Sequence, residues 1–279
     1  MLNQYEYIWE TKTRNHIFAR HWSPSTSPKS IILLIHGLGE HSGRYHDWAI
    51  RFVNDNYAVL AIDLPGHGNS WGKKGRIKNY SLLIEAISLL IAKTKELFPG
   101  IPYVLYGHSM GGNLVLRYTI KTKKQQGAII ASSPWLKLSK RPSIWKILAA
   151  RIIAFICPAL TFPSGINADY LSHDKNIVKA YTSDPLVHDR ISVSLFFGIQ
   201  EASRIIYRNK QKINIPLLIL HGSKDNITHP RGSKIFANGT GRYTTLRIWE
   251  NGYHELHNDT DKDQVYNFII QWIDKTITK

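Results

Sequence analysis

The chain has a single cysteine, Cys157, and this scarcity excludes two classes of protein. One thiol cannot close an intramolecular disulfide, and a thiolate metal cluster would lack ligands. Histidine is more frequent, with 13 residues, but none are paired at H-x-x-x-H spacing with supporting carboxylates. The sequence therefore predicts neither a metal nor a cofactor.

Long hydrophobic runs are also missing. The longest apolar stretch, residues 144–162, contains Lys146, Arg151 and Pro158. A charge at the centre of a membrane helix costs about 2.5–3.5 kcal/mol, so we do not expect this stretch to span a bilayer. Residues 1–10 are polar and aromatic and lack the apolar centre of a signal peptide. The expected location is the cytoplasm, with peripheral contact at a membrane left open.

Acidic residues are few, at 20 against 36 basic ones, which gives a formal net charge of +16. Such a balance predicts attraction to an anionic surface, although a generally basic proteome would give the same count. The basic residues are scattered and no nucleic-acid-binding motif accompanies them, so nucleic acid is not an expected partner. A length of 279 residues with 43% apolar content suits one large α/β domain with an insertion.

The chain is organised around residues 103–112, which read Y-V-L-Y-G-H-S-M-G-G. A short apolar run precedes the pentapeptide G-H-S-M-G, and a helix-like run follows it. Strand, sharp turn and helix are the context of a nucleophile elbow, in which Ser109 stands clear of the sheet. Gly107 and Gly111 leave room for the strand–helix crossing, and the helix N-terminus points its free N–H groups at the same place.

Ser109 needs a base, and the base needs an orienting acid, because a serine alcohol is a weak nucleophile. In this architecture the acid and then the histidine follow the serine along the chain. Asp225 follows a buried strand run at residues 217–220, and His254 follows a second strand at 246–249. We therefore predict a catalytic triad of Ser109, Asp225 and His254.

Two residues compete for these roles. His257 is a rival base, but it lies farther from the strand end than His254; it is otherwise a substrate-pocket residue or a polar residue at a helix start. Asp63 is a rival acid at a strand end, but it precedes the serine in the chain. Its surroundings, D-x-P-G-H-G, are more typical of a structural turn.

The remaining pattern predicts a mostly parallel sheet with helices on both faces. Buried strands are expected at 30–35, 58–62, 103–106 and 128–131, a hairpin at 5–10 and 16–22, and helices at 81–98 and 262–277. The alternation stops between about residues 133 and 207, where apolar, proline-containing, helix-like segments lack a clear buried strand. We predict a core of residues 1–132 and 209–279 and an inserted cap of residues 133–208 over the site.

These motifs resemble the α/β-hydrolase superfamily and, within it, the monoacylglycerol lipase and lysophospholipase group with a helical cap. The resemblance spans nearly the whole chain in order. Its most specific stretches are H-G-L-G-E-H-S-G-R-Y at residues 36–45 and Y-H-E-L-H at 253–257. Many hydrolases lack both stretches, whereas G-x-S-x-G alone is common.

The resemblance implies roles for five further residues. The backbone N–H groups of Leu38 and Met110 would form an oxyanion hole, and Glu40, Arg44 and His257 would recognise the glycerol end of a substrate. As alternatives, Leu38 is a plain loop residue, and Glu40 and Arg44 form a surface ion pair worth up to about 1 kcal/mol. The resemblance also implies a cap that carries the acyl tunnel and touches membranes.

The predicted activity is that of a serine esterase that cleaves monoacylglycerols to glycerol and fatty acid through an acyl-enzyme. A lysophospholipase with the same triad and a short-chain carboxylesterase are the enzymatic alternatives. A binding protein on a degenerate hydrolase fold and a peripheral membrane scaffold are the non-enzymatic ones. Trp145, Leu148, Ile152 and Ile156 form a stripe in the cap that either packs as a helix face or contacts a membrane. The expected partners are a single-chain lipid and a membrane surface, without an obligate protein partner.

Overall fold

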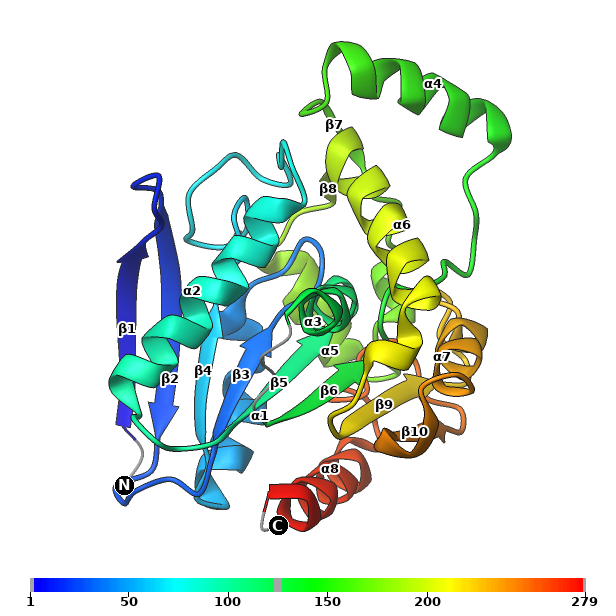
Figure 1. Ribbon diagram of the computed structural model, residues 1–279. Coiled ribbons are helices and arrows are strands. Elements are labelled where there is room, and N and C mark those ends of the chain that lie inside the picture. Colours follow the sequence, from blue (N-terminus) through cyan, green and yellow to red (C-terminus); the bar gives the residue numbers. More distant parts are fainter. Residues whose placement is uncertain (1–2, 123–126, 278–279) are drawn as a thin grey trace.

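Eight strands form one sheet in the order β1-β2-β4-β3-β5-β6-β9-β10 (Figure 1). The computed structural model describes residues 3–122 and 127–277. β2 pairs antiparallel with β1 and with β4, and every neighbouring pair from β4 to β10 is parallel. The strands are β1 (Asn3–Glu10), β2 (His16–Ser23), β3 (Ile31–Ile35), β4 (Ala58–Ile62), β5 (Tyr103–His108), β6 (Ala128–Ser132), β9 (Leu217–Gly222) and β10 (Thr244–Trp249).

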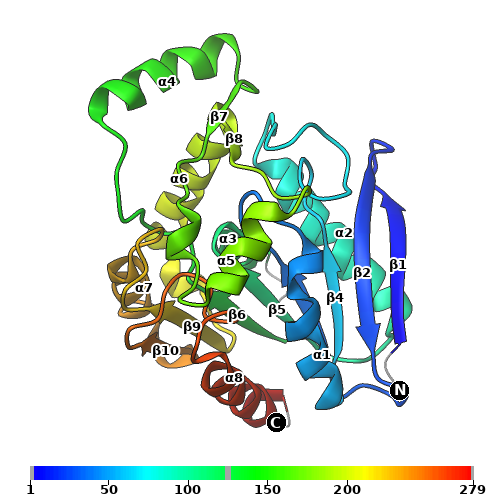
Figure 2. The ribbon, with the colours of Figure 1, turned by 180° about the vertical axis from the view of Figure 1, so that it is seen from behind.

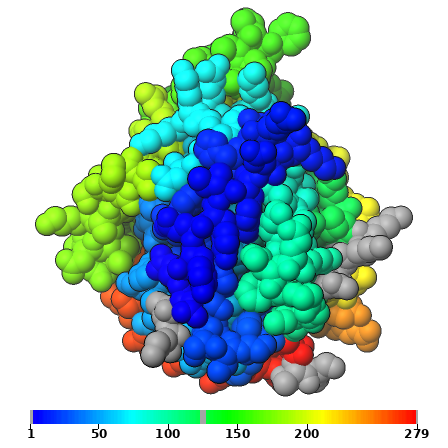
Figure 3. Space-filling view, turned by 90° about the vertical axis from the view of Figure 1, so that its left-hand side faces the viewer, coloured from blue at the N-terminus to red at the C-terminus, as the bar shows by residue number. Residues whose placement is uncertain are grey.

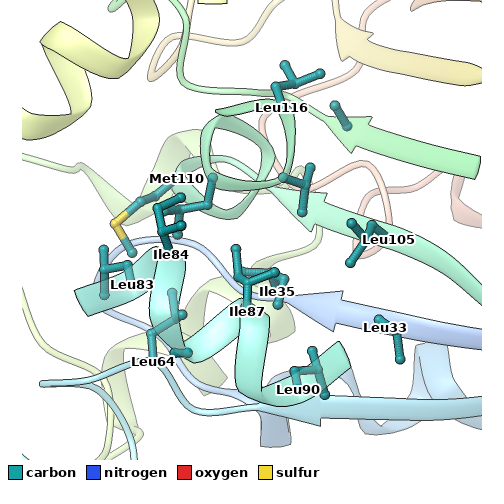
Figure 4. Close-up of a cluster of buried hydrophobic side chains, with 14 of the residues drawn as sticks. Leu33, Ile35, Leu64, Leu83, Ile84, Ile87, Leu90, Leu105, Met110 and Leu116 are labelled. Atoms are coloured by element: carbon teal, nitrogen blue, oxygen red, sulfur yellow. The ribbon is translucent and has the colours of Figure 1, made fainter. Parts of the chain in front are cut away.

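Helices cover both faces of the sheet, which explains why its central strands are apolar without alternation. β3 (I-I-L-L-I) and β4 (A-V-L-A-I) are buried at every position. Leu33 and Ile35 pack with α2 and α3 on one face (Figure 4), whereas Ile32 and Leu34 pack with α1 and α8 on the other. These helices are α1 (His46–Asn54), α2 (Ser81–Leu97), α3 (Met110–Lys121) and α8 (Lys262–Ile277), while α7 (Pro230–Ala237) packs against β9 and β10.

The segment between β6 and β9 lies above the carboxyl ends of the parallel strands, where the sequence predicts the cap (Figures 1 and 2). We call residues 133–208 the cap; its boundaries as a separate domain stay a prediction. Its elements are α4 (Ile144–Ile156), β7 (Thr161–Pro163), η2 (Ala168–Tyr170), α5 (Lys175–Ser183), β8 (Arg190–Ser192) and α6 (Val193–Arg208). The short 3-10 turns outside it are η1 (Ser42–Tyr45), η3 (Lys210–Lys212) and η4 (Gly241–Tyr243).

The helix α4 projects from the upper end of the molecule and has no buried residue (Figure 1). Ser143 caps its start, because its side chain accepts a hydrogen bond from the N–H of Lys146. Trp145 is 77% exposed and Phe155 is 92% exposed. Within the described residues, no helix combines the length and the apolar content needed to cross a membrane.

Candidate active site

Ser109 occupies the turn between β5 and α3 with φ 53° and ψ −113°, a backbone conformation that a residue with a Cβ rarely adopts. Three backbone hydrogen bonds hold the residue there, one of them from the N–H of Asn113 to its carbonyl at 3.1 Å. Its N–H donates to the carbonyl of Ser132 at 2.9 Å, and its carbonyl accepts from the N–H of Trp135 at 2.9 Å. The strained turn is therefore tied to the end of β6 and to the first residues of the cap.

Glycine is required on both sides of this turn because β5, β3 and α3 cross closely. A Cβ at Gly107 would lie 2.3 Å from the carbonyl oxygen of Gly111. A Cβ at Gly111 would lie 2.1 Å from the carbonyl oxygen of Ile35. Both distances are far below van der Waals contact, so no other residue fits at these positions without moving the backbone.

Asp225 and His254 form a buried pair, with Oδ2 of Asp225 2.7 Å from Nδ1 of His254. The other carboxylate oxygen accepts the backbone N–H groups of Ile227 and Thr228 at 2.8 and 2.9 Å. The Thr228 hydroxyl donates to Oδ2 at 2.8 Å, and Nε2 of His221 lies 3.2 Å from it. Burial would raise the pKa of Asp225, but these partners lower it well below its usual range.

The Asp225 carboxylate raises the pKa of His254. Burial lowers the pKa of His254, but attraction to and hydrogen bonding with Asp225 outweigh burial and raise it. Because Nδ1 is the atom that binds Asp225, Nε2 is the atom able to take a proton. His254 and Ser109 line the same small cavity, so the structure brings the three predicted triad residues together.

The loop after β3 passes against the nucleophile. A Cβ on Gly37 would lie 3.2 Å from the Cβ of Ser109. Within the described part of the chain, the N–H groups of Leu38 and Met110 donate to no other residue. The N–H of Gly37, by contrast, donates to Oε1 of Glu40 at 2.6 Å, which fixes the loop. Two free donors beside a serine are the arrangement that an oxyanion hole requires.

Glu40, Arg44 and Glu255 form a buried ionic network beside this loop. Arg44 donates to Glu40 at 2.6 Å and makes two hydrogen bonds to Glu255, at 2.7 and 2.8 Å. The hydroxyl of Tyr45 donates to Oε1 of Glu40 at 2.8 Å. The predicted pair of Glu40 and Arg44 is thus not a surface pair, since the two side chains are 4% and 8% exposed. Glu255, the residue after His254, was not singled out by the sequence.

Both carboxylates of this network depend on one guanidinium. Burial would raise the pKa of Glu255, but the Arg44 charge and its two hydrogen bonds lower it well below its usual range. The ring of Tyr181, on α5 of the cap, lies 4.7 Å from the guanidinium carbon of Arg44. Tyr181 lines the small cavity together with Glu40 and Glu255, and it too carried no sequence signal.

His257 lies deeper in the core than the sequence suggested. It is 2% exposed, and neither ring nitrogen finds a partner within the described residues. Its ring stacks on Tyr45 at 4.7 Å and lies edge-on to His108 at 4.9 Å. Burial lowers its pKa to about 4. Of the three predicted binding residues, Glu40 lines the small cavity at Ser109, whereas His257 and Arg44 line neither cavity there.

Asp63, the rival acid, is engaged within its own turn. One carboxylate oxygen accepts the N–H and the hydroxyl of Ser42 at 2.8 and 2.6 Å, and the other accepts the N–H of Asn69 at 2.9 Å. These bonds join the turn after β4 to the loop after β3. The geometry is that of a structural carboxylate.

The cap holds the loop that carries His254. The N–H of His254 donates to the carbonyl of Tyr170 at 3.3 Å, and the N–H of Glu255 donates to the carbonyl of Leu171 at 2.8 Å. The base therefore sits between the Asp225 carboxylate on the core side and a cap segment on the other. No local pattern in the sequence marked this contact.

A second Asp–His pair, Asp259 and His173, also joins the cap to the loop that carries His254. Oδ1 of Asp259 accepts the backbone N–H of His173 at 2.9 Å and lies 2.9 Å from its Nδ1. Oδ2 accepts the N–H of Tyr253, and the ring of His173 stacks on that of Tyr253 at 3.6 Å. Asp259 thus joins the cap to both ends of the His254 loop.

A cavity of about 230 Å³ extends from Ser109 between the core and the cap. Its lining is mostly apolar and contains no carboxylate. Apolar members of the lining include Leu38, Trp135, Leu138, Phe162, Ile166, Ile191, Phe196 and Ile227. Ser109, Leu38 and Ile166 belong to this cavity and to the small one, so they stand at the junction of the two. The small cavity has a mixed lining, with Glu40, His254 and Glu255 beside Leu38, Ile166 and Leu171.

The serine aminopeptidase S33 family model matches residues 26–261 of the chain. The chain belongs to this family. Its mostly parallel sheet, its elbow and its helical layers are those of the α/β-hydrolase fold, as the resemblance of its motifs predicted.

Individual relatives agree with this assignment. Human monoglyceride lipase is 30% identical over 92% of the chain and 86% of its own length. An uncharacterized abhydrolase domain-containing protein of Dictyostelium discoideum is 34% identical over 96% of the chain, which spans 28% of that protein. The crystal structure of Paleococcus ferrophilus monoacylglycerol lipase superposes with a TM-score of 0.82 and 31% identity, covering 98% of this chain and 99% of that one.

Proposed function

We propose that the chain hydrolyses the ester bond of monoacylglycerols to glycerol and free fatty acid. The observation that carries this proposal is the position of Ser109 at the junction of a mostly apolar cavity and a small one that the carboxylates of Glu40 and Glu255 line. An ester of one long acyl chain and one small polar alcohol has the same two-sided character. The human and Paleococcus relatives, named for this activity, support the same substrate class.

The proposed reaction runs through an acyl-enzyme. Nε2 of His254 takes the Ser109 proton while Oγ attacks the ester carbon, and the N–H groups of Leu38 and Met110 hold the resulting oxyanion. Collapse breaks the ester bond, and His254 returns the proton to the departing glycerol oxygen. A water molecule, deprotonated by His254, then attacks the acyl carbon and releases the fatty acid and Ser109. Asp225 keeps the proton on Nδ1 and stabilises the imidazolium.

The acyl chain is proposed to occupy the apolar cavity. Each methylene group removed from water contributes about 0.8 kcal/mol. The lining contains no carboxylate and Lys140 is its one charged residue, so few charges would lose water when the chain binds.

The alcohol is proposed to face Glu40, Glu255 and Tyr181. They line a space of only about 10 Å³, about that of one water molecule, so this side of the site must widen to admit glycerol. Arg44 neutralises one of the two carboxylates and fixes both, so the glycerol hydroxyls would meet a rigid, hydrogen-bonding wall. His257 is proposed to support this wall from behind, through its stack on Tyr45, rather than to touch the substrate.

Two other substrate classes fit the polar side less well. A lysophospholipid would bring its phosphate toward two carboxylates, Glu40 and Glu255, whose single countercharge is already used. An aminopeptidase substrate would bring an ammonium group to carboxylates whose oxygens already accept hydrogen bonds from Arg44 and, at Glu40, from Tyr45 and the N–H of Gly37. A monoacylglycerol carries no charge and avoids both problems.

The proposal includes contact between α4 and a lipid surface, at which the protein would be peripheral. Single-chain lipids reside in bilayers and micelles, and the apolar residues of α4 are exposed. Lys146 and Arg151 on the same helix would favour an anionic surface.

A panel of substrates tests the proposal, with monoacylglycerols, lysophospholipids and an amino-acid p-nitroanilide assayed on the wild-type protein and on Ser109→Ala. We expect preferred turnover of monoacylglycerols, fluorophosphonate labelling of the wild type, and loss of both in a folded Ser109→Ala protein. Preferred turnover of lysophospholipid at matched chain length would contradict the substrate. Retained turnover in the variant would contradict the nucleophile.

A further inference from the structure

The loop between β4 and α2 carries a concentration of positive charge that the proposed reaction does not use. Residues 64–84 contain four basic residues and no acidic one: Lys73, Lys74, Arg76 and Lys78. All four are exposed, and they alternate with the buried Gly75 and Ile77. The four charged side chains therefore face solvent from a segment whose backbone is held in place by the two buried residues.

These charges surround an apolar groove. A cavity of about 250 Å³ is lined by Trp71, Ile77 and Leu82, with Lys73, Arg76 and Lys78 also lining it. Within the described residues, none of these three cations pairs with a carboxylate, whereas Lys74 donates to the carbonyl of Pro185.

Trp71 adds an unused donor to the same groove. Its indole N–H is buried and has no acceptor among the described residues. A buried donor without a partner is uncommon in folded proteins. The groove thus combines an apolar floor with three cations that pair with no carboxylate among the described residues.

The loop is joined to the base of α4 through β8 and the first residues of α6. Ser192 accepts the N–H of Ile77 and donates to its carbonyl, at 3.2 and 2.7 Å. The next two residues donate their N–H groups to the segment that follows α4: Val193 to Leu160 and Ser194 to Pro158, both at 3.0 Å. The loop and α4 lie at the same end of the molecule, and in Figure 3 the cyan atoms of the loop border the green atoms of the cap.

We propose that the groove formed by Trp71, Lys73, Arg76, Ile77 and Lys78 binds the phosphate headgroup of an anionic membrane lipid. The cations would contact the phosphate, and the apolar floor would cover the lipid's glycerol backbone. The loop would then be a second membrane contact, electrostatic in character, beside the apolar α4. The inference concerns binding alone and is independent of the proposed hydrolysis.

Vesicle binding by the full-length Ser109→Ala protein tests this site without substrate turnover. Vesicles of phosphatidylcholine alone are compared with vesicles that also contain phosphatidylglycerol. Each basic residue near an anionic surface changes binding roughly fivefold. The triple change Lys73→Gln, Arg76→Gln, Lys78→Gln should therefore weaken binding to the anionic vesicles on the order of 100-fold at low salt. Binding to phosphatidylcholine should stay the same.

The matched control removes three charges elsewhere. Lys95, Lys234 and Lys275 are exposed on α2, α7 and α8, away from the upper end of the molecule. Changing all three to Gln should weaken anionic binding much less. Equal losses in the two triple variants would show that only the net charge matters and would overturn the proposal. So would unchanged binding in the loop variant, or displacement of vesicles by inorganic phosphate at matched ionic strength.

Folding of the loop variant is checked separately. With Ser109 present, its turnover of p-nitrophenyl butyrate should match that of the wild type, because the loop residues lie outside both cavities at Ser109. If turnover falls, the single change Arg76→Gln, which should weaken anionic binding roughly fivefold, replaces the triple variant in the vesicle assay.

Discussion

Arg44 binds Glu255 through two parallel hydrogen bonds, although 211 positions separate the two residues. The contact joins the loop after β3, which passes Ser109, to the loop that carries His254. The same guanidinium also binds Glu40. One buried side chain therefore fixes the two loops that must meet at the reacting atoms.

Replacing Arg44 with Met should strongly destabilise the protein, because two buried carboxylates would lose their countercharge. Removal of one partner from a buried pair costs about 3–5 kcal/mol. The control is Arg51→Met, since Arg51 pairs with Asp263 near the surface, with side chains 31% and 72% exposed. That change should cost about 1 kcal/mol or less. Urea unfolding measures both, and Arg44→Met/Glu255→Gln should recover part of the loss. Equal effects of the two single changes would contradict the network.

His257→Phe should be tolerated, because the His257 ring is stacked, buried and without hydrogen bonds in the described structure. Phenylalanine keeps the stack on Tyr45 and removes two unpaired nitrogen atoms. His257→Gln, by contrast, should cost about 1–3 kcal/mol, since it places an amide among rings. Thermal unfolding and kcat/KM on a monoacylglycerol are the measurements. A large rise in KM for the folded Phe variant would instead support the predicted binding role of His257.

As the pH is lowered, the protein should lose its activity before it unfolds. His254 must be neutral to act as a base, and its pKa is raised above 6.5, so kcat/KM falls as the pH drops through that raised value. The pKa values of His21, His188 and His257 are instead lowered to about 4 by burial. Unfolded histidines bind protons first, so the free energy of unfolding falls as the pH drops from about 6.5 toward 4.

The raised pKa of His254 acts in the opposite direction, because its protonation stabilises the folded protein as the pH falls. His21, His188 and His257 together outweigh this single contribution. Parallel profiles of p-nitrophenyl butyrate turnover and of circular dichroism separate the two processes. Unfolding that accompanies the first loss of activity would show that the two share a cause, contrary to the expectation.

The exposed residues of α4 should matter for lipid substrates only. Ile152 and Ile156 are 65% and 75% exposed, so changing them to Ser should leave the fold intact. Burial of one isoleucine contributes about 1.5–3 kcal/mol, so each change should weaken vesicle binding roughly tenfold or more. Hydrolysis of long-chain monoacylglycerols should slow, while turnover of p-nitrophenyl butyrate stays constant. Equal losses on both substrates would mean that these residues stabilise the core.

The sequence predicted the parts of the fold that depend on local pattern. β3 and β4 are continuous apolar runs because helices cover both faces of the sheet, and α8 occupies the predicted residues 262–277. The elbow was predictable because its glycines and its serine are adjacent in the chain. These features need no knowledge of distant partners.

Other features depend on contacts that no local pattern records. The apolar stripe of α4 has the same spacing whether it is buried or exposed, and only the arrangement of the cap shows it to be exposed. Glu255 looked like one charged residue among others, because its partner Arg44 lies at the far end of the chain. The cap segment that holds His254 binds through backbone carbonyls, and these carry no side-chain signature.

The hydrogen bonds between the cap and the His254 loop limit which parts of the cap can be exchanged in an engineered variant. Tyr170 and Leu171 each accept a hydrogen bond from the catalytic loop, so exchanging the whole cap for that of another hydrolase would also remove support for the base. The stretch that can be grafted is α4 itself, which has no buried residue. Swapping this outer helix would change the exposed apolar surface, while the residues that line the cavity at Ser109 and those that support His254 stay untouched.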